Sequence, residues 1–128
     1  MFVVPFVIIV RMDRLRTWGP LIAWCALIFA ASHVPHLDAA HRLGDPDGAV
    51  YDYPLRKVAH LVEYGVLYLL ALRPLKTPGR AFLFAVLYAL SDEFHQHFVP
   101  GRDGKGTDVL IDACGAALAW IWSRNRAR

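Results

Sequence analysis

Acidic and histidine side chains recur at helical spacing in three separate stretches of the sequence. In the first stretch, His60, Glu63 and Tyr64 follow an i, i+3, i+4 pattern, and Lys57 precedes them by about one turn. Residues at these spacings lie on one face of a helix. The sequence therefore predicts a polar face at the beginning of an otherwise apolar helix.

The second and third stretches repeat this arrangement. In the second, Tyr88, Asp92, His95 and Gln96 fall on one helix face, whereas Glu93 and His97 fall on another. In the third, Asp108 and Asp112 are one turn apart, and the small residues Gly115, Ala116 and Ala119 follow and favour close helix approach. Three helices are thus predicted to bring carboxylates and imidazoles to a similar depth.

Carboxylates and imidazoles in such a pattern suit three kinds of chemistry. They could bind the polar part of an amphiphile, or hold a divalent cation that activates water, for which His60, Glu63, Glu93 and His95 are the candidate ligands. The histidines could also titrate near neutral pH in a proton-coupled or scaffolding role. No HExxH pattern is present, and no cofactor other than a divalent cation is suggested.

The elements that must position these residues are apolar. Of the 128 residues, 56% are hydrophobic and 20% charged. Residues 1–11 are interpreted as an N-terminal extension and residues 12–128 as one transmembrane domain. The expected fold is all-α, an integral membrane bundle of four transmembrane helices. The predicted spans cover residues 18–34, 55–72, 79–97 and 107–122.

A soluble four-helix bundle is the rival interpretation. The first predicted span carries no charge, and none of the four shows a well-defined polar face of the kind that a soluble bundle presents to water. The third and fourth spans reach bilayer length only when their polar ends are included. The membrane interpretation is therefore preferred, with Cys25 and Cys114 expected to be buried thiols that fill gaps between helices.

The distribution of charge predicts the topology. One set of loops and termini holds nine basic residues and one acid, Asp13, whereas the other set with the polar helix ends holds five basic residues and ten acids. By the positive-inside rule, the N and C termini are cytoplasmic and the polar helix ends face outward. The net charge of +3 is then a topology signal, and nucleic acid is not an expected partner.

A structural interpretation competes for each residue taken alone. Asp108, for example, lies where a carboxylate would interact favourably with a helix N-terminus. His33, His36 and His41 fall in the outer loop region and are expected to be solvated, and His97 is expected to be interfacial. A charge inside a bilayer is costly, so the dense polar set as a whole is better explained by a functional site than by isolated helix caps.

The runs KVAHLVEY (57–64), SDEFHQHFVPGR (91–102) and DVLIDACG (108–115) resemble the VanZ-like family. This family comprises small bacterial membrane proteins named for a factor that gives low-level resistance to the glycopeptide teicoplanin. The resemblance covers nearly the whole chain from Met12, and it adds Pro100, Gly101 and Arg102 to the set of functional positions. The chain departs from the family over residues 103–106, where it reads DGKG.

The resemblance implies a multi-pass protein of the bacterial cytoplasmic membrane with a function in the cell envelope and in antibiotic resistance, but no established reaction. The preferred hypothesis is an outward-facing site that binds an envelope lipid intermediate or a lipophilic glycopeptide among the membrane lipids. Arg102 would pair with a phosphate or carboxylate of that ligand. Two alternatives stay open, a metal-assisted hydrolase acting on a lipid-linked phosphate and a proton-coupled or scaffolding protein.

Overall fold

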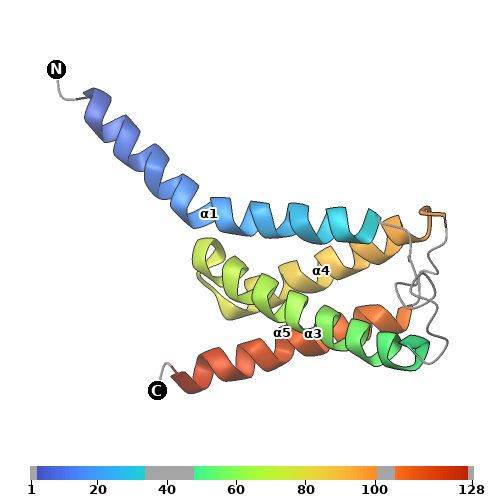
Figure 1. Ribbon diagram of the computed structural model, residues 1–128. Helices are drawn as coiled ribbons and strands as arrows, with labels where there is room; N and C mark the ends of the chain where they lie inside the picture. The colour runs from blue at the N-terminus through green and yellow to red at the C-terminus, as the bar shows by residue number, and fades with distance from the viewer. Residues whose placement is uncertain (1–2, 34–47, 101–105, 127–128) are drawn as a thin grey trace.

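The computed structural model describes residues 3–33, 48–100 and 106–126. Within these ranges the chain forms four α-helices and no strand, which confirms the all-α prediction. The helices run alternately in opposite directions, so that α1 begins and α5 ends on the same side of the bundle (Figure 1). Their bounds are Val3–His33 for α1, Gly48–Leu75 for α3, Pro78–Gln96 for α4 and Gly106–Arg126 for α5.

Helix α1 is longer than the first predicted span. It begins at Val3, so the predicted N-terminal extension and the span from residue 18 belong to one continuous helix. Pro20 lies inside this helix. Because proline lacks a backbone N–H and its ring crowds the preceding turn, it favours a bend there. Figure 1 shows α1 changing direction in this region, with its N-terminal part leading away from the other helices.

Helix α3 extends beyond both predicted ends of the second span. It begins at Gly48, seven residues before residue 55, and it includes Pro74 and ends at Leu75. The sequence predicted a stop at Leu72 because proline cannot donate the next helical hydrogen bond. Only that one bond is lost, however, and the Lys76 N–H closes the last turn by donating to the Leu72 carbonyl at 2.9 Å.

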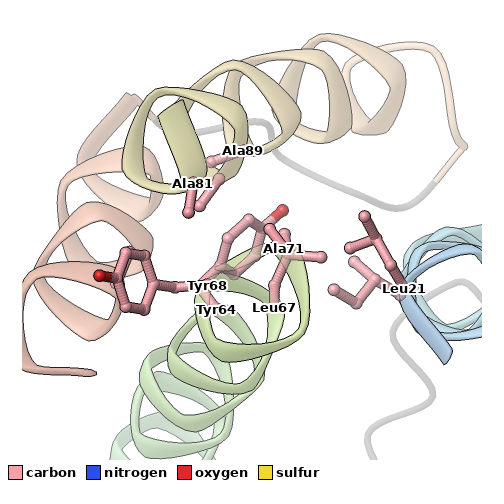
Figure 2. Packing of buried hydrophobic residues seen from close by; sticks show 10 residues of the cluster. Leu21, Tyr64, Leu67, Tyr68, Ala71, Ala81 and Ala89 are labelled. Atoms are coloured by element: carbon pink, nitrogen blue, oxygen red, sulfur yellow. The ribbon is translucent and has the colours of Figure 1, made fainter. Parts of the chain in front are cut away.

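Small residues dominate the buried contacts between the helices. The buried face of α4 consists of Ala81, Ala85 and Ala89 followed by polar residues, and these alanines pack against two fully buried tyrosines of α3, Tyr64 and Tyr68 (Figure 2). Small side chains let helix backbones approach closely, which is how helices associate in membranes, where no hydrophobic effect drives them together. The packing therefore resembles that of a membrane bundle.

Large apolar side chains lie on the outside of every described helix. Ile22 on α1 is 63% exposed, Leu87 on α4 is 55% exposed and Leu110 on α5 is 67% exposed. Two stretches, Met12–His33 and Pro54–Leu75, are long and apolar enough to cross a membrane, and most of their residues are not buried in the bundle. A core helix of a soluble protein would be mostly buried, so this exposure favours the membrane interpretation.

The two cysteines differ in exposure. Cys25 is partly buried, but Cys114 is exposed, so the prediction that both thiols fill gaps between helices is wrong for Cys114. The reason is its position on α5. Gly115 and Ala116 face the other helices and are buried, and the helical rotation between neighbouring residues turns Cys114 away from this buried face.

Candidate functional site

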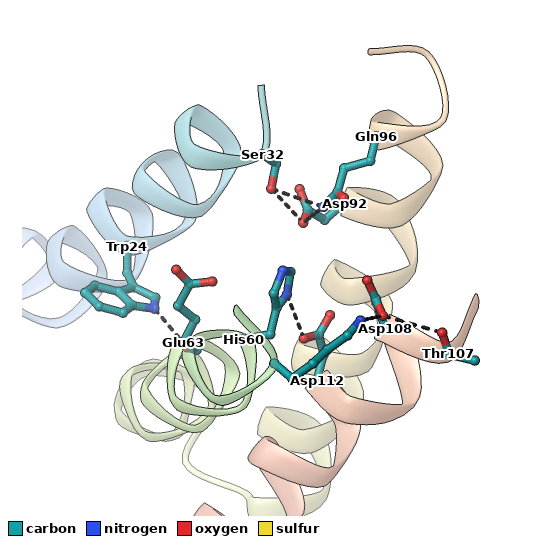
Figure 3. A network of polar contacts seen from close by, with 10 residues as sticks. Trp24, Ser32, His60, Glu63, Asp92, Gln96, Thr107, Asp108 and Asp112 are labelled. Atoms are coloured by element: carbon teal, nitrogen blue, oxygen red, sulfur yellow. Dashed lines mark hydrogen bonds and ion pairs between the residues drawn. The ribbon is translucent and has the colours of Figure 1, made fainter. Parts of the chain in front are cut away.

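Polar side chains from all four helices converge at one end of the bundle, where α1 and α4 end and α3 and α5 begin (Figures 1 and 3). We refer to them as the polar cluster. Its members are Ser32 of α1, Lys57, His60 and Glu63 of α3, Asp92 and Gln96 of α4, and Asp108 and Asp112 of α5.

Two ion pairs join α3 to α5 in the polar cluster. Lys57 pairs with Asp108, and His60 Nδ1 lies 3.1 Å from Asp112 Oδ1. The side chain of Asp112 is only 3% exposed. Lys57 and His60 are spaced i, i+3 and the two aspartates i, i+4, so consecutive turns of each helix contribute one partner. Lys57 and His60 thus share a helix face, as predicted, and so do Asp108 and Asp112.

A second set of contacts ties α4 to the end of α1. Ser32 Oγ donates to Asp92 Oδ2 at 2.8 Å, and Gln96 Nε2 donates to the same oxygen at 2.8 Å. The Gln96 amide also donates to Ser32 Oγ at 3.4 Å. All three residues are buried. Asp92 and Gln96 share the predicted face of α4, but sequence reasoning did not identify Ser32 as their partner.

Two buried polar atoms at this end have no hydrogen-bond partner among the described residues. They are the hydroxyl oxygen of Tyr64, whose side chain is fully buried, and Asp92 Oδ1. The side chain of Tyr64 extends from α3 toward α4 (Figure 2). Burying a polar group without a partner costs free energy, and such groups are rare in native proteins. A group from outside the chain would remove this cost by hydrogen bonding to them.

The histidines of α1 and α4 form a separate contact beside the polar cluster. His33 Nδ1 lies 3.3 Å from His95 Nε2, and the ring of Phe29 packs against His95 in a tilted arrangement with centroids 4.6 Å apart. His33 is exposed, as predicted for a solvated residue, but it also contacts His95, which the sequence did not predict. His97 is exposed, and its predicted position at the membrane interface stays a prediction; the predictions for His36 and His41 fall outside the described residues.

The four candidate metal ligands do not meet at one point. His60 contacts Asp112, whereas His95 contacts His33 and Phe29. Among the described residues, no three histidine, cysteine, aspartate or glutamate side chains are placed so that they could hold a metal ion. Glu63 points into the polar cluster (Figure 3), and Glu93 lies on α4 next to Asp92, but a metal centre gains no support from their placement.

Two side-chain contacts with backbone carbonyls fix α1 on the bundle, and sequence reasoning missed both. Trp24 Nε1 donates to the Glu63 carbonyl at 3.0 Å, and the Tyr88 hydroxyl donates to the Cys25 carbonyl at 2.6 Å. Such contacts leave no sequence pattern because any residue supplies a carbonyl. The only feature of the sequence that suggests these contacts is the presence of Trp24 and Tyr88, whose rings each carry one polar atom that seeks a hydrogen-bond partner when buried.

The end of the motif at residues 91–102 extends beyond the described residues. Pro100 is exposed after the end of α4, while Gly101 and Arg102 lie outside the described residues. The prediction that Arg102 joins the site therefore stays a prediction.

Comparison with known proteins gives one result. A family model described as VanZ/LLP1 matches residues 3–125, which is nearly the whole chain. No curated protein and no solved structure matches the chain significantly.

Proposed function

The chain belongs to the VanZ-like family, and on this premise we propose that it is a multi-pass protein of the bacterial cytoplasmic membrane whose polar cluster binds the polar part of an amphiphile. The ligand would be an envelope lipid or a lipophilic glycopeptide in the outer leaflet. All four described helices would span the bilayer, with both termini in the cytoplasm. The observation that carries the binding proposal is the pair of buried, unpartnered polar atoms on Tyr64 and Asp92.

The membrane location is supported by a distribution of side chains opposite to that of a soluble protein. Large apolar residues cover the outside of the helices, while Asp92, Gln96 and Asp112 are buried inside. In water such a molecule would expose its most hydrophobic surface, which monomeric soluble proteins rarely do over large areas. In a bilayer the same arrangement keeps charge away from hydrocarbon.

The chemistry of the polar cluster favours a ligand that donates hydrogen bonds. The polar cluster and the neighbouring Glu93 carry five carboxylates, of which Asp108 pairs with Lys57 and Asp112 with His60. Asp92 Oδ1 is an acceptor only, unless its carboxyl group is protonated. A hydroxyl or amino group of a ligand would satisfy this oxygen and would add the charge-assisted hydrogen bond that a carboxylate makes best.

The route to these atoms is through the contact of α1 with α4. Ser32 covers Asp92 from the α1 side by its hydrogen bond, and Leu21 and Ile28 are the buried apolar residues of α1. An amphiphile that arrives within the outer leaflet would place its polar part at the level of this contact and its acyl chain along the exposed apolar side chains of the helices. The proposed site is thus reached from the lipid phase, once Ser32 and part of α1 move aside, rather than from water alone.

The experiment uses the full chain purified in detergent micelles. Teicoplanin is the probe, and a glycopeptide without an acyl chain is the comparison ligand. We expect teicoplanin to raise the unfolding temperature of the wild-type protein and the non-acylated glycopeptide to raise it less. Asp92→Asn, which keeps the shape of the side chain but removes its charge, should reduce the teicoplanin shift by at least half.

The matched control is Asp13→Asn, because Asp13 is an exposed acid on α1 that lies near Pro74 and Lys76 at the end of α3, away from the polar cluster. It should leave the shift unchanged. Equal shifts for the wild type, Asp92→Asn and Asp13→Asn would contradict binding at the polar cluster. The absence of any shift would exclude a lipophilic glycopeptide as the ligand and leave the envelope lipid to be tested by mass spectrometry of the co-purified lipids.

A further inference from the structure

A second polar recess lies at the end of the bundle opposite the polar cluster. It is an open pocket of about 350 Å³ between the N-terminal half of α1 and the end of α3. Its lining residues are Asp13, Arg14, Thr17 and Trp18 of α1, with Pro74 and Lys76 at and after the last turn of α3. Two cations and one acid thus line a pocket that is open to the surroundings.

The charge around this pocket is strongly positive. Among the described residues, the helix ends and connections on this side carry eight basic residues against the single acid Asp13. Arg14 and Lys76 come from segments far apart in the sequence and line the same pocket. An arginine fork and a lysine ammonium are the groups that proteins use most to bind phosphate. An anion in the pocket would relieve the repulsion between them.

Trp18 indicates at what depth this pocket would lie in a membrane. Its side chain is 42% exposed and lines the pocket beside Arg14. Tryptophan is enriched at the level of lipid headgroups, because its ring is apolar and its N–H needs a polar partner. An indole next to two cations is therefore suited to the boundary between the phosphate group and the acyl chains of a phospholipid.

The backbone at Lys76 is the most unusual feature of the pocket. Lys76 has a φ of 60°, and it is the sole described non-glycine residue with a positive φ. Glycine or asparagine is the usual choice where a helix ends in this left-handed conformation. A lysine here is held in a conformation that glycine would adopt at lower cost, and the same residue lines the pocket. This combination points to a role for the ammonium group itself.

We propose that this pocket binds the phosphate group of an anionic phospholipid, with Lys76 and Arg14 as its two cationic contacts. The proposal rests on the membrane location proposed above but not on the ligand of the polar cluster. It places a structural lipid in the cytoplasmic leaflet, where it joins the end of α3 to the N-terminal half of α1.

The test measures lipid binding by native mass spectrometry and by the shift in unfolding temperature of the full chain in detergent. The probes are phosphatidylglycerol, phosphatidylcholine and inorganic phosphate. We expect phosphatidylglycerol to bind the wild type at least tenfold more tightly than phosphatidylcholine. Lys76→Gly should weaken phosphatidylglycerol binding at least fivefold, while its unfolding temperature without lipid is equal to or above that of the wild type.

Two further variants complete the experiment. Arg14→Gln should weaken binding to a similar extent. Arg124→Gln removes the same charge from the exposed end of α5 on the same side of the bundle, outside the pocket lining, and should leave the affinity unchanged. The proposal is overturned if Lys76→Gly binds phosphatidylglycerol as the wild type does, or if Arg124→Gln weakens binding equally, since the effect would then be one of net charge.

Inorganic phosphate as a competitor shows whether the pocket binds a phospholipid headgroup or a free phosphate ion. If millimolar phosphate does not displace phosphatidylglycerol from the wild type, the lipid assignment is supported. If phosphate binds the pocket as tightly as the lipid does, the lipid assignment is overturned in favour of a free anion. If no ligand binds the polar cluster but the protein still prefers phosphatidylglycerol to phosphatidylcholine, the phospholipid pocket is supported although the proposed function fails.

Discussion

The two sides of α3 contact their neighbours by different physical means. Toward α5 the backbones touch, and a Cβ built on Gly115 would lie 2.1 Å from the Leu61 carbonyl oxygen. Toward α1 the contact is made by side chains: Leu21 and Ile28 pack into the apolar cluster, and Trp24 donates to the Glu63 carbonyl. In the described residues α1 has no contact with α5. The difference indicates a tight unit of α3, α4 and α5 on which α1 is docked.

This comparison bears on the proposed function because Asp92 lies under the docked helix. A ligand that reaches Asp92 needs to displace Ser32 and to move part of α1, but it need not disturb the backbone contact of Gly115 with α3. The rigid unit would hold the carboxylates in place, and the docked helix would admit the ligand. The predictions below test this division, beginning with the contact on which the rigid unit most depends.

Gly115→Ala is expected to have the largest effect. The added methyl group would meet the backbone of Leu61, which cannot rotate away, so α3 and α5 have to separate along their whole contact. Overpacking costs up to about 3 kcal/mol, of which alanine's better helix propensity returns about 1 kcal/mol. We expect a net loss of about 2 kcal/mol in the free energy of unfolding, measured by titrating detergent micelles with sodium dodecyl sulfate.

Gly19→Ala is the matched control, since it makes the same chemical change within α1 at a position where the added methyl group meets nothing within 4 Å. It should be neutral or stabilising by up to about 1 kcal/mol. If Gly115→Ala and Gly19→Ala have the same effect, the backbones of α3 and α5 do not approach as closely as described, and the division into a rigid unit and a docked helix fails.

Asp112→Ala is expected to have an intermediate effect. Its carboxylate is buried and lies 3.1 Å from His60 Nδ1, so the substitution leaves the imidazole without this partner between α3 and α5. We expect a loss of about 1.5 kcal/mol in the free energy of unfolding, at the upper end of what a hydrogen bond contributes in a membrane bundle.

A double-mutant cycle with His60→Ala isolates the contribution of this pair. Removing Asp112 from a protein that already lacks His60 should cost less than half as much as removing it from the wild type. Additive effects of the two substitutions would show that His60 and Asp112 do not stabilise the α3–α5 contact through each other.

The rigid unit was largely predictable from the sequence, whereas the docking of α1 was not. Helical spacing placed Lys57 with His60 and Asp108 with Asp112 on shared faces, and the small residues after Asp112 indicated a close helix approach, which the structure shows to be with α3. These features depend on periodicity, which a sequence displays directly. The ends of the helices were less predictable, because α3 continues through Pro74 at the cost of a single hydrogen bond.

The contacts of α1 depend on tertiary arrangement and have no sequence signature. Ser32 is an ordinary residue near a helix end until Asp92 is seen beside it, and the partners of Trp24 and Tyr88 are backbone carbonyls. The exposure of Cys114 has the same origin, since it depends on which side of α5 faces α3. The proposed site lies where the unit of α3, α4 and α5 contacts α1. Residue spacing could therefore identify the acids of the site, but it could not predict that Ser32 of α1 covers Asp92.

Two matched substitutions at tyrosines give the smallest expected effects and the sharpest test of the division. Tyr88→Phe removes the hydroxyl that donates to the Cys25 carbonyl, and it should cost about 0.6 kcal/mol. Tyr64→Phe removes a buried hydroxyl that has no partner among the described residues, so it should leave the ligand-free protein equally or more stable.

Backbone hydrogen exchange distinguishes the two tyrosine variants by region. Tyr88→Phe should speed exchange in α1 while leaving α5 unchanged, because α1 opens more readily when one of its tethers is lost. Tyr64→Phe should leave exchange unchanged everywhere but should weaken the response to teicoplanin, since its hydroxyl is proposed to contact the ligand. Faster exchange in α5 for Tyr88→Phe would show that the four helices open together, and α1 could then not serve as the separate entrance to Asp92.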